Sequence, residues 1–182
     1  MPLTFFGAYL GYRREVAPFP VVTHNIPRQI PEQPWYSGSV LSVCIGGVLP
    51  FGVVFVELFF VLSSLWLDQY YYVFGFLLIV FIILIVACAE ISIVLTYFQL
   101  CGEDYNWWWR SMLNSGSSAF YLFVYSVYYF FTRLEVVGFT PGLLYFGYMF
   151  LLSTAFFLLT GVIGYFSCLW FNVKIYAAIK VD

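Results

Sequence analysis

One uninterrupted apolar run constrains this chain more than any other feature. Residues Val73–Ala89 read VFGFLLIVFIILIVACA, without one charged or strongly polar side chain, and Glu90 follows directly. A core helix of a soluble protein shows a polar stripe every three or four residues, and this run shows none. The surrounding segment, residues 70–100, is long enough to cross a bilayer, for which about 20 apolar residues suffice. The run therefore predicts a transmembrane helix.

Composition supports a membrane protein. Of 182 residues, 63% are hydrophobic and only 9% are charged, whereas a soluble domain has about 25% charged residues. Seven basic residues and a net charge of −2 make no basic patch, so we expect no nucleic-acid partner. The four cysteines form no CxxC pair, which argues against a disulfide framework or a zinc site.

Polar segments divide the chain into its predicted parts. We expect an all-α fold: a polytopic transmembrane helical bundle with four complete spans plus the end of a preceding, truncated one. The complete spans are predicted at residues 38–66, 70–100, 111–131 and 142–171 within a bundle covering 38–171. The truncated span is predicted at 1–12, a Pro-rich cytosolic strap at 13–37 and a cytosolic tail at 172–182.

Small residues indicate where helices approach one another. Gly46 and Gly47 allow close approach in the first complete span, and Pro50 should kink it. The start of the third span, Ser111–Ser118, is small and polar, which favours helix–helix contact over lipid contact. The three tryptophans that precede it (Trp107–Trp109) suit an anchor at the membrane interface better than a binding stack.

The distribution of basic residues predicts the orientation. The strap, the turn at 101–110 and the C-terminus would share one side and carry six of the seven basic residues: Arg13, Arg14, Arg28, Arg110, Lys174 and Lys180. The other side has Arg133. Because cytoplasmic loops are enriched in Lys and Arg, the strap and the C-terminus are predicted to be cytosolic.

Two acids lie inside predicted spans, Glu57 and Glu90. An intramembrane acid suggests a proton or cation site, or recognition of a polar group in another helix. The simpler interpretation is a protonated or hydrogen-bonded glutamate that holds helices together. At 1.5 Å per residue the two would differ by about 15 Å in depth, so we do not expect a carboxylate dyad.

No pattern of catalytic residues appears. The sequence has no HExxH, GxSxG or phosphate-binding glycine loop, and its single histidine, His24, lies in the strap. We therefore expect neither an enzyme nor a bound cofactor or metal. The tail ends in Lys180-Val181-Asp182, and this pattern alone is a weak address signal.

Several segments, in order along the whole chain, resemble the nonaspanins, the transmembrane-9 superfamily. They are IPRQIPEQ (26–33), LPFG (49–52), YYVFGFLLIVFII (71–83), QLCGEDYNWWWR (99–110), LYFGY (144–148) and KIYAAIKVD (174–182). The resemblance implies the C-terminal portion of a nine-span protein of Golgi and endosomal membranes. It further implies that Lys180 and Asp182 form a retention signal that the COPI coat reads, and that the family sorts other membrane proteins.

We thus expect a multi-pass membrane protein whose partners are the lipid bilayer, client transmembrane proteins and the COPI coat. Glu57 and Glu90 are possible intramembrane polar contacts. The alternative is an ion- or proton-coupled transporter or channel that uses one of these two acids.

Overall fold

The protein is described by a computed structural model that covers residues 2–15, 20–21, 26–33, 38–66, 70–133 and 139–179. Within these ranges, the side chains of 57–66 and 70–74 are not part of the description. The described residues are helical or irregular and contain no strand, so the predicted all-α class is confirmed.

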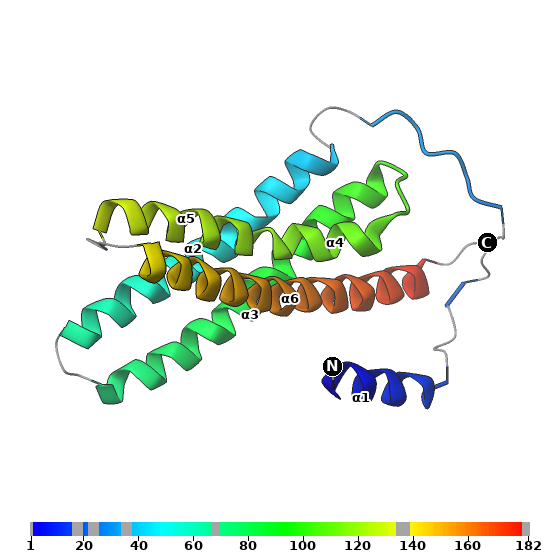
Figure 1. Cartoon of the computed structure of the whole chain (residues 1–182). Coiled ribbons are helices and arrows are strands. Elements are labelled where there is room, and N and C mark those ends of the chain that lie inside the picture. Colours follow the sequence, from blue (N-terminus) through cyan, green and yellow to red (C-terminus); the bar gives the residue numbers. More distant parts are fainter. Residues whose placement is uncertain are drawn as a thin grey trace. The chain divides into compact units, whose positions relative to one another are not determined.

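The described residues form six helices that follow one another along the chain (Figure 1). Their bounds are α1 Pro2–Tyr12, α2 Ser39–Trp66, α3 Tyr70–Cys101, α4 Trp107–Gly116, α5 Ser118–Arg133 and α6 Phe139–Ala178. Helices α1, α2 and α3 fall within one residue of the ranges 1–12, 38–66 and 70–100. The last predicted span, 142–171, lies wholly within α6. The division of the chain into truncated span, strap, bundle and tail stays a prediction.

Three helical segments are long and apolar enough to cross a membrane among the described residues: Ser39–Val56, Gly75–Cys101 and Phe139–Ala178. Two helices, α4 and α5, occupy the range 111–131, for which a single continuous span was predicted. The break falls at Ser117, whose hydroxyl donates to the carbonyl oxygens of Asn114 and Val43. A serine that bonds back to its own helix in this way tends to bend it.

The chain divides into two compact units, residues 29–171 and residues 1–28 with 172–182. In the larger unit α2 packs against α3, α4 and α5, and α3 packs against α4. Its apolar core joins Val54, Leu84, Cys88 and Leu122. In the smaller unit the side chains of α1 are exposed, and the Arg13 guanidinium lies over the Tyr9 ring.

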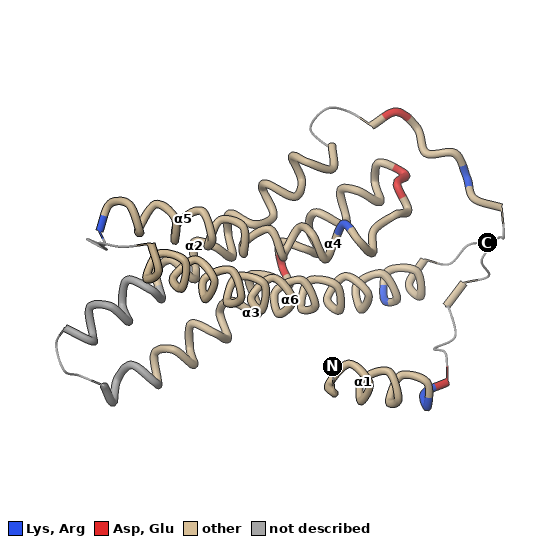
Figure 2. The backbone as a smooth tube through the Cα atoms, in the orientation of Figure 1, with Lys and Arg blue, Asp and Glu red and all other residues tan. Residues whose placement is uncertain are grey.

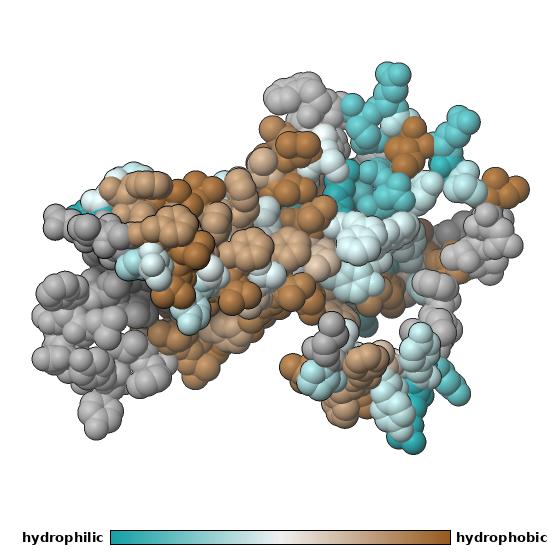
Figure 3. Space-filling model, in the orientation of Figure 1, coloured by the Kyte–Doolittle hydropathy of each residue, from teal (hydrophilic) through white to brown (hydrophobic). Residues whose placement is uncertain are grey.

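The surface of the larger unit is mainly apolar. Figure 3 shows hydrophobic side chains over the helices, with hydrophilic ones gathered at one end. Many large apolar side chains of α3, α5 and α6 are exposed, including Phe131 and Leu151. Because lipid tails solvate such side chains, this surface fits a bilayer environment.

Candidate functional site

Small polar side chains line the packed interior between α3, α4 and α6. Ser115 donates from its hydroxyl to the carbonyl oxygen of Thr160 at 2.8 Å, and both residues are fully buried. The Thr96 hydroxyl and the Cys168 thiol share a hydrogen bond of 3.1 Å. A Cβ added at Gly164 would lie 2.7 Å from the Cβ of Ser115. The predicted helix-contact face at 111–118 is therefore confirmed as an internal packing surface.

A second close approach joins α2 to the α4–α5 junction. A Cβ at Gly46 would lie 2.6 Å from the Asn114 carbonyl oxygen, and one at Gly47 would lie 2.7 Å from the backbone of Ser117 and Ser118. The predicted close approach at the two glycines is confirmed. The Ser42 hydroxyl donates to the side-chain oxygen of Asn114 at 3.3 Å, which adds a polar contact to the same seam.

Pro50 lies inside α2 and is fully buried, and the helix continues on both sides of it. Trp107 stacks on Tyr165 of α6, with ring centroids 5.7 Å apart, whereas Trp109 is 69% exposed. The three tryptophans are thus the first residues of helix α4 and not part of the connecting turn predicted at 101–110. One of them packs inward, and a second keeps the outward position expected of an interfacial anchor.

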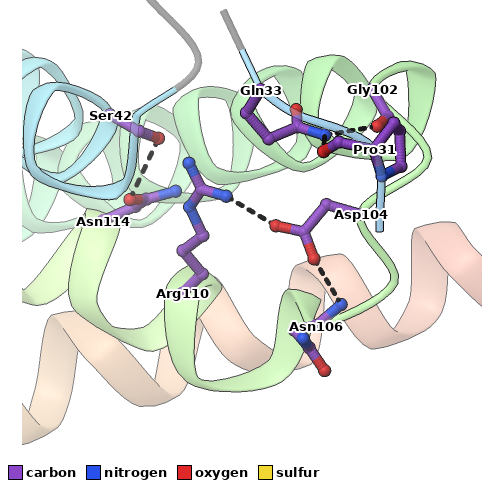
Figure 4. Close-up of polar contacts among 8 residues, drawn as sticks. All are labelled: Pro31, Gln33, Ser42, Gly102, Asp104, Asn106, Arg110 and Asn114. Atoms are coloured by element: carbon purple, nitrogen blue, oxygen red, sulfur yellow. Dashed lines mark hydrogen bonds and ion pairs between the residues drawn. The ribbon is translucent and has the colours of Figure 1, made fainter. Parts of the chain in front are cut away.

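A polar cluster closes one end of the bundle (Figure 4). Arg110 Nη1 and Asp104 Oδ2 form an ion pair at 2.8 Å, and their side chains are only 10% and 12% exposed. The other Asp104 oxygen accepts from the Asn106 backbone N–H at 3.1 Å. The Gln33 side-chain amide donates to the carbonyl oxygen of Gly102 at 2.7 Å, so the strap is tied to the turn after α3.

The turn after α3 has a helix-capping geometry that explains the position of Asp104. Its N–H donates to the Gln99 carbonyl oxygen, and the N–H of Glu103 donates to that of Leu100. This is the pair of bonds of a Schellman motif, with Glu103 in the left-handed conformation at φ 59°. This cluster was not predicted from the sequence, although opposite charges, Asp104 and Arg110, stand on either side of the tryptophans there.

The structure describes the side chain of only one of the two acids that were predicted inside spans. Glu90 is exposed on α3, and it has no hydrogen bond or ion pair to any residue that the structure describes. Glu57 lies in α2, but its side chain is outside the described residues. The separation predicted for the two carboxylates therefore stays a prediction.

The remaining predicted site residues are the two ends of the tail signal. Lys180 and Asp182 lie outside the described residues, as does His24. All four cysteines are free. Within the described ranges, no group of three His, Cys, Asp or Glu side chains could hold a metal ion.

The sequence itself matches the family model of endomembrane protein 70 over residues 1–139. The chain belongs to the endomembrane protein 70 family. Similar relatives of this family include transmembrane 9 superfamily member 8 of Arabidopsis thaliana, with 60% identity, and member 4 of Homo sapiens, with 54% identity. Each match covers the whole chain, so the resemblance to the transmembrane-9 superfamily is confirmed.

The chain spans only 28% of the length of these relatives. No solved structure matches it. The family and the relatives' names identify a multi-pass membrane protein, and they do not favour the alternative of an ion- or proton-coupled transporter.

Proposed function

We propose that this chain acts in the sorting and trafficking of other membrane proteins in Golgi and/or endosomal membranes, without catalysing a reaction. In this proposal the outer surface of the bundle contacts the transmembrane helices of client proteins. Lys180 and Asp182 form the signal that binds the COPI coat, and the C-terminus faces the cytosol. Membership of the endomembrane protein 70 family supports the location.

The observation that carries the sorting proposal is the outward position of Glu90. An acid in the hydrocarbon region is costly, and such residues almost always face a bundle interior or a partner. Here the carboxyl group is exposed on α3 and lacks a partner among the described residues. An outer helix face that carries such a group is suited to recognise a polar group in another transmembrane helix.

The proposed topology has four spans, the third of which is formed by α4 and α5 together. Trp107–Arg133 covers 27 residues, about 40 Å of helix. Ser117 between the two helices keeps helical dihedral angles, and its N–H donates to the Leu113 carbonyl oxygen. The interruption is thus a local bend in one continuous path. With four spans, the strap and the tail share the cytosolic side.

The coat proposal is tested by localisation of the chain, tagged at its N-terminus so that the C-terminal carboxylate stays free. Lys180→Ala combined with Asp182→Ala should move the protein out of the Golgi, while the control Val181→Ala should leave it there. Golgi residence that is unchanged in the double variant would exclude these residues as the signal.

The sorting proposal is tested with single-span reporters that differ only in the middle of their transmembrane helix. Surface delivery of a reporter with a central Asn should change when the protein is depleted, whereas surface delivery of a reporter with a central Leu should stay the same. Equal behaviour of all reporters, with and without the protein, would contradict a role in sorting.

A further inference from the structure

Helix α3 has two opposite faces in the bundle. One is buried against the other helices, and its members recur at helical spacing: Leu84, Cys88, Ser92, Thr96 and Gln99. The other is exposed and recurs with the same spacing: Ile79, Ile83, Val86, Glu90, Val94 and Tyr97. At 100° per residue the exposed set falls within an arc of about 80°, so it forms one continuous stripe along the helix. We name these six residues the outer stripe.

Glu90 lies well inside the membrane-spanning helix, nearer its Cys101 end. It follows Tyr70, the first residue of α3, by 20 residues and precedes Cys101, the last, by 11. These intervals correspond to about 30 Å and 16 Å along the helix. Figure 2 shows most charged positions at the ends of the helices and in the turns.

The described part of the bundle supplies no cation for this carboxylate. Arg110 is paired with Asp104 at the end of the bundle, and Arg133 is the last residue of α5. The stripe residues on either side of Glu90, such as Val86 and Val94, are apolar and about half exposed. An approaching helix would therefore meet a mainly apolar stripe with a single acidic group, Glu90, inside the membrane-spanning part.

We propose that the outer stripe is the docking site for a client transmembrane helix that carries a basic side chain, Lys or Arg, at the depth of Glu90. This inference rests on the proposed sorting function and names the class of client. The argument is charge complementarity, because intramembrane acids pair with basic groups and charge-assisted hydrogen bonds are stronger than neutral ones. The apolar stripe residues pack along the client, and the carboxylate fixes its register.

The test is co-capture of single-span reporters by the full chain in a lipid bilayer. The reporters carry Lys, Leu or Glu at the position level with Glu90 in an otherwise identical helix. Capture should follow the order Lys, Leu, Glu, with the Lys reporter exceeding the Leu reporter about fivefold or more. This comparison leaves the protein unmodified, so it does not depend on whether a variant folds. Equal capture of the three reporters would overturn the proposal.

Variants of the protein test whether Glu90 is the residue that recognises the basic side chain. Glu90→Gln should remove the preference for Lys, and Glu90→Lys should transfer it to the Glu reporter. Leu151→Gln, on the exposed face of α6, is the matched control for adding a polar group to the lipid-facing surface and should keep the preference. A preference for Lys that survives Glu90→Gln would overturn the proposal.

Two other occupants of the stripe would give different results. If the stripe packs against a further helix of the same polypeptide or a second copy of the chain, Glu90→Gln lowers stability or self-association and the reporters are captured equally. That outcome also overturns the proposal. A sorting response to the Asn reporter without any charge preference would refute only this inference, whereas no response to any reporter would refute the proposed function itself.

Discussion

The close approach of α2 to the α4–α5 junction can be tested by adding one methyl group at Gly47. A Cβ there would lie 2.7 Å from both the Ser117 carbonyl carbon and the Ser118 nitrogen. These are backbone atoms, which cannot rotate away as a side chain can. Ordinary contacts of a Cβ lie at 3.4–4 Å, so the helices must separate by about 1 Å.

The expected cost follows from that separation. Overpacking a well-packed site typically costs about 1–3 kcal/mol. Moving α2 away also weakens the hydrogen bonds from Ser117 to the Val43 carbonyl oxygen and from Tyr121 to that of Cys44. Each interhelical bond of this kind contributes about 0.6 kcal/mol in a membrane protein. Alanine is more favourable than glycine in a helix by up to about 1 kcal/mol, which offsets part of this cost. We therefore expect the free energy of unfolding to fall by about 2 kcal/mol.

Gly52→Ala is the matched control in the same helix. No atom lies within 4 Å of a Cβ built at Gly52, so this variant keeps the helix-propensity gain without a clash. Equilibrium unfolding in mixed micelles should therefore separate Gly47→Ala from Gly52→Ala by about 2–3 kcal/mol. If the two variants are equally stable, the close approach between these helices does not exist in the membrane.

Three further predictions concern single contacts and use the same unfolding measurement. Glu103→Gly should be about 1 kcal/mol more stable than Glu103→Ala, because only glycine adopts φ 59° without strain; equal stability would exclude strain there. Asp104→Ala should cost about 3 kcal/mol because it leaves Arg110 buried without this partner. Removing both charges should then cost less, and a larger loss in the double variant would contradict this explanation. Ser115→Ala should cost about 0.6 kcal/mol, the value of its bond to Thr160, and a neutral result would mean that this bond adds nothing.

The long helices could be predicted from the sequence because insertion into lipid is a local property. A run such as Val73–Ala89 must satisfy its own backbone hydrogen bonds once it is in the hydrocarbon region, and only a helix allows that within one segment. The same reasoning identified the acids inside spans. The glycines of α2 and the small polar start of α4 also indicated contacts, since close helix packing in a membrane selects small residues.

Which face of each helix turns inward was decided only by the tertiary structure. Lipid is as apolar as a leucine side chain, so periodicity does not separate the buried Leu84 from the exposed Val86 of the same helix. For the same reason the sequence placed Glu90 inside a span but did not place it on the outer face. The break at Ser117 and the pairing of Asp104 with Arg110 depend on contacts between segments, and no local pattern specifies such contacts.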